Sequence, residues 1–179
     1  MKPGKRIAIV GVTGSGKTTL ARRLANRLRI PRVELDTLFW KAGWQPVEVE
    51  VFRQRVDAAL APGPHGAWVT DGNYRQARDI IWGRADTLVW LDYSLPLAFT
   101  RLLRRTLGRI LRREVLYNGN TESFRNTFFS RDSIILYLFQ SHPRLRATYP
   151  GLLAQPEYSH LAVIRLKTPR QAEEWVINE

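Results

Sequence analysis

Five short apolar runs are spaced along the chain, with room for a helix between most of them. The first, Ile7-Ala8-Ile9-Val10, is continuously apolar, as expected for a strand buried on both faces. The others are rich in Val, Leu, Ile or Trp and span residues 32–36, 67–71, 87–91 and 161–166. The pattern therefore predicts five β-strands.

Apolar residues recur with the helical period between these runs. The first helix is indicated by Ala21, Leu24, Ala25 and Leu28. Further helices are expected over 52–60, near 76–82, over 95–113, through Phe124, Phe128, Ile135, Leu138 and Phe139, and from Pro169 onward. Pro143 and Pro150 predict that the stretch before the last strand is broken into short pieces. Strands that alternate with helices favour parallel pairing, with ligands at the carboxyl ends of the strands.

Residues 11–19, Gly-Val-Thr-Gly-Ser-Gly-Lys-Thr-Thr, form the most specific motif of the chain. They match the spacing G-x-x-x-x-G-K-[ST], directly after the first strand and directly before the first helix. Small residues let backbone N–H groups touch a triphosphate, and the helix N-terminus adds partial positive charge. We therefore predict a nucleotide site formed by Gly11, Thr13, Gly14, Ser15, Gly16, Lys17, Thr18 and Thr19.

Two side chains of this loop carry the predicted chemistry. The ammonium group of Lys17 can reach the β and γ phosphates, and the hydroxyl of Thr18 is placed to bind Mg²⁺. The alternative, a glycine-rich turn that binds nothing, does not explain why the motif stands between a strand and a helix.

Three predicted strands end in an aspartate: Asp36, Asp71 and Asp92. We expect Asp71 to hold Mg²⁺ directly or through water, with capping of the following helix as the alternative. Asp36 is the candidate to orient or deprotonate an acceptor hydroxyl, or to hold Mg²⁺ through water if the acceptor is already an anion. Asp92 is expected to be a loop or helix-capping residue.

An aromatic cluster over residues 37–44 follows Asp36 and includes Trp40. Two interpretations stay open. The cluster either stacks on a bound acceptor, which would make Trp40 an acceptor-binding residue, or closes the hydrophobic core.

The helix over residues 95–113 is strongly amphipathic, with five arginines on its polar side: Arg101, Arg104, Arg105, Arg109 and Arg112. No acid occurs between Asp92 and Glu114, so these arginines have no partner within the helix. We expect an anion nearby, a nucleotide or a nucleic acid, and a solvated basic face is the alternative. Residues 114–122, with Asn118-Gly119-Asn120, are expected to form a turn or a short mobile segment.

Composition narrows the classes of protein. The 179 residues suit one domain, and neither a signal peptide nor a membrane span is apparent, so we expect a cytoplasmic protein without membrane contact. There are no cysteines, and the three histidines lack ligand spacing, so the expected metal is Mg²⁺ bound by oxygen. The net charge of +12 comes mainly from 23 arginines and fits phosphate or nucleic-acid binding, or a basic surface.

The order of these motifs resembles the adenylate kinase group of P-loop kinases. More narrowly, Leu35-Asp36-x-Leu38-Phe39-Trp40-x-x-Gly43-Trp44 and Asp71-Gly72-Asn73-Tyr74, together with the arginine-rich helix, are similar to adenylate kinase-related or DNA topology modulation proteins. The resemblance covers essentially the whole chain. It implies a three-layer P-loop fold for residues 1–179, with a five-stranded parallel sheet in the order 2-3-1-4-5 and a helical lid over about 101–131.

The resemblance also assigns roles to three arginines. Arg75 matches the arginine that grips an acceptor phosphate, Arg101 the one at the donor adenine, and Arg105 a phosphate-contacting one. Asn73-Tyr74 replaces the Phe-Pro of adenylate kinases, and the lid is short, so AMP is not implied as the acceptor.

We therefore expect a kinase that transfers the γ-phosphoryl group of ATP–Mg²⁺ to a nucleotide or another small acceptor. Lys17, Asp36 and Arg105 are its predicted catalytic residues. The alternative is a DNA-associated ATPase or a nucleotide-binding regulator that uses the arginine-rich helix.

Overall fold

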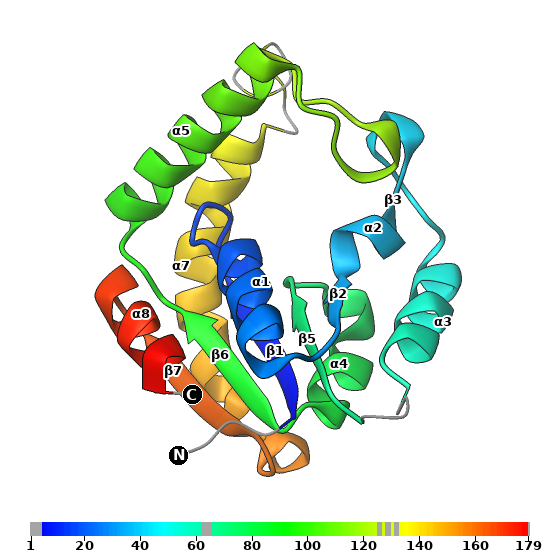
Figure 1. The fold of residues 1–179 in the computed structure, drawn as a ribbon, viewed down its shortest axis with the longest axis vertical. Coiled ribbons are helices and arrows are strands. Elements are labelled where there is room, and N and C mark those ends of the chain that lie inside the picture. Colours follow the sequence, from blue (N-terminus) through cyan, green and yellow to red (C-terminus); the bar gives the residue numbers. More distant parts are fainter. Residues whose placement is uncertain (1–4, 62–65, 125–126, 128–129, 131–132, 179) are drawn as a thin grey trace.

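The computed structural model describes residues 5–61, 66–124, 127, 130 and 133–178. Its centre is a five-stranded parallel sheet with the order β2-β5-β1-β6-β7 (Figure 1). The strands are β1 (Arg6–Gly11), β2 (Arg32–Glu34), β5 (Trp68–Asp71), β6 (Thr87–Leu91) and β7 (Ala162–Leu166). Counted along the chain, this is the predicted order, so the predicted α/β fold is confirmed.

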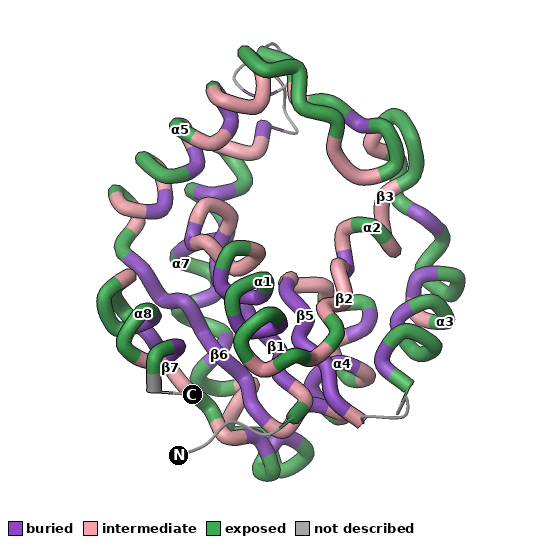
Figure 2. Tube along the Cα trace, in the orientation of Figure 1, coloured by how far each residue is buried: buried purple, intermediate pink, exposed green. Residues whose placement is uncertain are grey.

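Helices cover both faces of the sheet, because successive side chains of a strand point to opposite faces. Ile7 and Ile9 pack in one core with residues of α1 (Lys17–Leu28) and α8 (Pro169–Asn178). Ala8 and Val10 pack in a second core, which receives α3 (Val49–Ala59), α4 (Arg78–Arg84) and α7 (Ile134–Leu153). Figure 2 shows the central strands buried between largely exposed helix surfaces. These are the three predicted layers.

The remaining elements lie toward the carboxyl ends of the strands, where α5 (Leu95–Arg112) extends past the sheet (Figure 1). Residues 113–122, which we call the lid loop, run from the tip of α5 to β3. Residues 37–46, which we call the aromatic hairpin, contain the end of α2 and an antiparallel strand pair. The short elements are α2 (Leu35–Phe39), β3 (Trp40–Lys41), η1 (Ala42–Trp44), β4 (Gln45–Pro46), η2 (Arg75–Ala77), η3 (Tyr117–Gly119) and η4 (Pro156–Tyr158).

The helix α7 runs unbroken past Pro143 and Pro150, so the prediction of short pieces is wrong. A proline inside a helix removes one N–H donor and frees the carbonyl four residues earlier. Both prolines are exposed, which lets water bind those carbonyls. Leu145 and Tyr149, on the same helix, are buried in the core. Packing therefore outweighs the local cost of the prolines.

The start of α7 also differs from the predicted helix. The hydroxyl oxygen of Ser133 accepts a hydrogen bond from the backbone N–H of Ile135 at 3.2 Å, which caps a new helix at this point. Phe128, expected in an earlier part of that helix, lies outside the described residues. Within the described ranges, no helix has both the length and the apolar character needed to cross a membrane.

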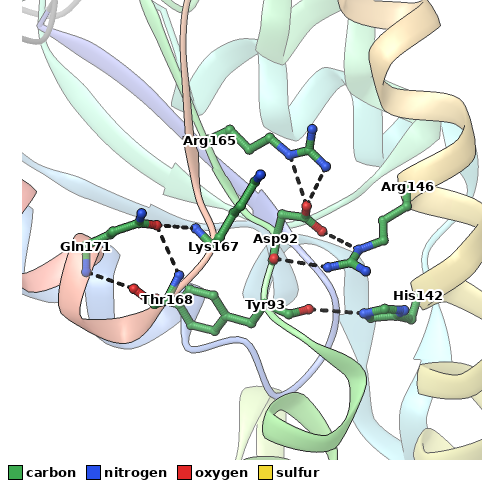
Figure 3. A network of polar contacts seen from close by, with 8 residues as sticks. All are labelled: Asp92, Tyr93, His142, Arg146, Arg165, Lys167, Thr168 and Gln171. Carbon is green, nitrogen blue, oxygen red and sulfur yellow. Dashed lines mark hydrogen bonds and ion pairs between the residues drawn. The ribbon is translucent and has the colours of Figure 1, made fainter.

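Asp92 lies in the loop after β6, which is one of the two expected alternatives, and it is the centre of an ion-pair cluster instead of a helix cap (Figure 3). Its buried carboxylate accepts hydrogen bonds from Nε of Arg146 and Nη2 of Arg165, both at 2.6 Å. Nε2 of His142 lies 3.0 Å from the carbonyl oxygen of Tyr93. Arg165 belongs to β7, whereas Arg146 and His142 belong to α7. The cluster therefore joins both elements to residues 92 and 93, directly after β6. Attraction to two guanidinium groups prevails over capping.

Candidate functional site

The P-loop, residues 11–19, is packed closely against its neighbours at two glycines. Gly11 has a φ of 145°, and a Cβ there would lie 2.6 Å from the carbonyl oxygen of Leu91. Gly14 has a φ of 78°, and a Cβ there would lie 2.3 Å from the carbonyl oxygen of Ala98 on α5. Side chains at these positions would displace the loop from β6 and α5, so packing and backbone conformation both require glycine.

The ammonium group of Lys17 lies at the centre of the site. Its Nζ donates to the carbonyl oxygen of Val12 at 3.0 Å. Burial lowers the pKa of Lys17, whereas the charges of Asp71 and Asp36 raise it and that of Arg105 lowers it further. The fold therefore brings Lys17 near both predicted site acids and one predicted arginine of α5.

Thr18 and Asp71 are also brought together, as a magnesium site requires. The hydroxyl of Thr18 donates to Oδ2 of Asp71 at 2.8 Å, and Nη1 of Arg32 lies 3.5 Å from Oδ1. Burial raises the pKa of Asp71, while the Thr18 hydrogen bond and the charge of Lys17 lower it. Asp71 thus faces α1 and does not cap the helix that follows it.

A hydroxyl oxygen beside a carboxylate oxygen is a donor set that suits Mg²⁺. Among the described residues, no three His, Cys, Asp or Glu side chains gather to hold a metal ion on their own. The residues present therefore fit a metal ion that takes its other ligands from nucleotide phosphates and water.

Asp36 lies in the first turn of α2, because the strand predicted over 32–36 ends at Glu34. Its Oδ1 accepts a hydrogen bond from the hydroxyl of Tyr74. A second phenol, Tyr117 of the lid loop, lies nearby: burial, then the charges of Asp36 and Asp71, raise the pKa of Tyr117 to about 12. Two tyrosines from distant parts of the sequence therefore face the same carboxylate.

Trp40 packs within a series of aromatic rings. Its ring centroid lies 4.8 Å from that of Phe39 and 5.6 Å from that of Trp44, both in edge-to-face contact. Phe39 continues the series to Tyr74, with 4.8 Å between their centroids. The ring of Trp40 is half-buried. Its packing is thus established, while its contact with an acceptor stays a prediction.

The arginines of α5 have different surroundings. Nη1 of Arg101 donates to the carbonyl oxygen of Ser15 at 3.3 Å, which places this side chain against the P-loop. Nε of Arg105 is buried without a hydrogen-bond partner in the described part of the chain, and burial lowers the pKa of Arg105. Arg109 instead pairs with Glu122, with Nη1 2.9 Å from Oε1. Arg101 therefore lies against the P-loop and Arg105 lies near Lys17, while their contact with a nucleotide stays a prediction.

Arg75 is not held in the site. It is exposed at the start of η2, and within the described ranges its side chain has no hydrogen bond or ion pair, while its carbonyl oxygen accepts from the N–H of Arg78. Its predicted contact with an acceptor phosphate stays a prediction.

Sequence reasoning missed Asn73. Its Nδ2 donates to the carbonyl oxygen of Gly11 at 2.6 Å, and its Oδ1 accepts from the Gly11 N–H at 3.1 Å. The hydroxyl of Tyr149 donates to the same Oδ1 at 3.1 Å. The only signal in the sequence was the departure of Asn73-Tyr74 from the Phe-Pro of adenylate kinases. Asn73 holds the first residue of the P-loop beside the end of β5.

Two curated relatives of the chain are shikimate kinases. The chain is 34% identical over 119 residues to the one from Paramagnetospirillum magneticum, and 32% identical over 103 residues to the one from Corynebacterium diphtheriae. The matches cover 59% and 49% of this chain, and 58% and 57% of the relatives. The chain thus spans little more than half the length of either relative. No family model matches it.

Solved structures match nearly the whole chain. A gluconokinase from Sinorhizobium meliloti matches with a TM-score of 0.54 and 17% identity, over 98% of this chain and 93% of that one. A shikimate kinase from Bacteroides thetaiotaomicron matches with a TM-score of 0.51 and 19% identity, over 97% and 94%. This chain has the P-loop kinase fold. At such identities the likeness establishes the fold alone, and the narrower resemblance to DNA topology modulation proteins stays a prediction.

Proposed function

We propose that this P-loop protein is an ATP-dependent phosphotransferase, which moves the γ-phosphoryl group of ATP to a hydroxyl group of a small molecule. The observation that carries the proposal is the position of Lys17, whose ammonium group interacts with both Asp71 and Asp36. Asp71 belongs to the predicted metal site, and Asp36 lies beside the aromatic hairpin. The curated relatives, which are named as kinases of a small hydroxy acid, support such an acceptor.

In the proposed reaction, Asp36 accepts the proton of the acceptor hydroxyl. The acceptor oxygen forms a bond to the γ phosphorus, the bond from that phosphorus to the bridging oxygen breaks, and ADP leaves. Lys17 and Arg105 neutralise the charge on the transferred group. Mg²⁺ held by Thr18 and Asp71, directly or through water, would supply further neutralisation of the phosphate oxygens. For an acceptor that is already an anion, Asp36 would orient Mg²⁺-bound water instead.

A phosphoryl-transfer screen tests this proposal. ATP and Mg²⁺ are incubated with shikimate, gluconate, nucleosides and nucleoside monophosphates, and products are detected by ³¹P NMR and mass spectrometry. We expect a phosphorylated acceptor with the unmodified protein and a loss of product with Asp36→Asn. Failure to cleave ATP with any of these compounds or with water would contradict the proposal.

The second candidate is a DNA-associated ATPase or a nucleotide-binding regulator, as the narrower resemblance implies. The observations in its favour are the net charge of +12 and the three exposed arginines of α5: Arg101, Arg104 and Arg112. The curated relatives do not favour it, because they are named as shikimate kinases.

A further inference from the structure

The lid loop is attached to the aromatic hairpin by a set of amide hydrogen bonds. Nδ2 of Asn118 donates to the carbonyl oxygens of Trp40 at 2.5 Å and Thr37 at 3.1 Å. Nδ2 of Asn120 donates to the carbonyl oxygen of Lys41 at 2.9 Å, and its Oδ1 accepts from the N–H of Trp44 at 2.8 Å. These bonds join two segments that are far apart in sequence. They hold the lid loop, which follows α5, beside β3 (Figure 1).

The lid loop also has an internal structure that favours this attachment. The N–H of Leu116 donates to the carbonyl oxygen of Asn120 at 2.6 Å, and Val115 pairs with Thr121 as an antiparallel bridge. Asn118 has a φ of 54°, a left-handed conformation that asparagine tolerates better than most residues. Asn120 is 3% exposed. The described residues of this loop therefore form a compact turn, which is the first of the two expected alternatives.

This attachment presents the lid loop to the acceptor side of the site. The carbonyls that hold Asn118 belong to Thr37, which adjoins Asp36 on α2, and to Trp40. Tyr117 precedes Asn118, and the charge of Asp36 contributes to its raised pKa. Tyr74 donates to Oδ1 of Asp36, and the Tyr117 phenol interacts with the same carboxylate. The phenol of Tyr117 can then meet a second oxygen of the same acceptor.

We propose that Tyr117 is an acceptor-binding residue that determines which hydroxyl compounds react at Asp36, and that Asn118 and Asn120 position it. This inference rests on the proposed function, because it needs Asp36 to serve the acceptor. In this role the lid loop binds the acceptor and keeps water away from Asp36, while nucleotide binding depends on the P-loop and α5.

The test compares four proteins: the unmodified chain, Tyr117→Phe, the double variant Asn118→Ala with Asn120→Ala, and Tyr158→Phe. The last is a matched control, because it removes one phenol hydroxyl from a residue that packs against Trp82 in the core. Each protein is assayed for ATP cleavage with water alone, and for transfer to shikimate, gluconate or deoxyadenosine. Kinetics give kcat and the KM values for ATP and acceptor.

We expect Tyr117→Phe to raise the acceptor KM about tenfold, the effect of one lost hydrogen bond in a partly buried site, with the KM for ATP unchanged. The double asparagine variant should raise ATP hydrolysis by water about tenfold, again with an unchanged KM for ATP, because water gains access to Asp36. Tyr158→Phe should behave as the unmodified protein does.

Three other outcomes would each overturn the inference. If the Tyr117 and asparagine variants behave as Tyr158→Phe does, while Asp36→Asn still abolishes activity, the lid loop has no role at the acceptor and the proposed function stands. If they raise the KM for ATP, the loop serves the donor. Absence of ATP cleavage by the unmodified protein, even with water, would overturn the proposed function and this inference with it.

Discussion

The donor and acceptor sides of the site are built in different ways. The P-loop is one continuous stretch of nine residues, 11–19, whose shape depends on glycines packed against β6 and α5. The acceptor side combines the aromatic hairpin with the lid loop, and its hydrogen bonds join residues 76 to 81 positions apart. The difference teaches that a phosphate-binding motif can be encoded locally, whereas the proposed acceptor side depends on tertiary contacts between side-chain amides and a distant backbone.

Removal of the Lys17 ammonium group should have the largest effect, and only on the donor side. We expect Lys17→Ala to lower kcat/KM by about 1,000-fold through lost ATP binding and charge neutralisation, with the fold retained. Isothermal titration calorimetry with ATP measures the loss of binding, and far-UV circular dichroism checks that the fold is retained. Lys167→Ala, at an exposed lysine before α8, is the control for the loss of one positive charge. Unchanged ATP affinity in a folded Lys17→Ala protein would refute the P-loop assignment.

Replacement of Asp36 and of Asp71 should give different phenotypes, because we assign them to the acceptor and to the metal ion. Asp36→Asn should lower kcat about 100-fold with ATP affinity nearly unchanged, because it removes the proton acceptor at the acceptor hydroxyl. Asp71→Asn should raise the Mg²⁺ concentration needed for half-maximal rate, because its carboxylate adjoins Thr18. Steady-state kinetics with titrated Mg²⁺ distinguish them. Identical phenotypes would show that the division of roles is wrong.

The arginines of α5 allow a matched comparison of nucleotide and nucleic-acid binding. Replacement of Arg101 and Arg105 by Ala should lower phosphoryl transfer about tenfold to 100-fold, whereas the same change at the exposed Arg104 and Arg112 should leave it unchanged. Duplex DNA binding is measured for both variants over a range of salt concentrations. A greater loss of DNA affinity than of transfer in the Arg101 and Arg105 variant would favour the nucleic-acid candidate.

The sequence predicts the donor side nearly residue by residue, because the P-loop spacing and its strand–loop–helix context are local. The resemblance also implies the strand order that the sheet has, and the sequence places Asp71 at the end of its strand, where its role toward Mg²⁺ stays a prediction. The attachment of Asn118 could not be predicted, because an Asn-Gly-Asn turn does not indicate which distant carbonyls it will meet. Pro143 misled for a related reason: its cost is local, while the packing that outweighs it comes from the whole core.

The Asp92 cluster should affect stability and leave both sides of the site functional. Asp92→Asn leaves Arg146 and Arg165 without their carboxylate, and we expect a loss of about 1–3 kcal/mol in the free energy of unfolding. Urea denaturation measures it, with Asp57→Asn at a more exposed ion pair as the control. The KM for ATP should change by less than about twofold. A larger change would show that the cluster is linked to the P-loop.

The smallest effect should come from Asp86, at the opposite end of the sheet from the site. Hydrogen bonds from Arg6 hold the pKa of the Asp86 carboxyl below its usual value. Its stabilisation is therefore complete above the unfolded pKa, near about 4, and is lost as the pH falls through the folded value. For this partly exposed pair we expect less than about 1 kcal/mol. Thermal melts from pH 7 to pH 3 should show a shallower acid loss in Asp86→Asn than in the unmodified chain.

Outside the lid loop itself, its two asparagines bond to main-chain atoms of residues 37–44, and within the loop Asn120 also donates to the carbonyl oxygen of Tyr117. The Trp44 indole adds a bond to the carbonyl oxygen of Thr121. Main-chain carbonyls and N–H groups are the same whichever side chain stands beside them. The rings of Phe39 and Trp40 can therefore be exchanged by mutation without loss of these asparagine contacts. A protein built this way can diversify its substrate range in evolution, or in a combinatorial library, while the closure of its acceptor site is inherited unchanged.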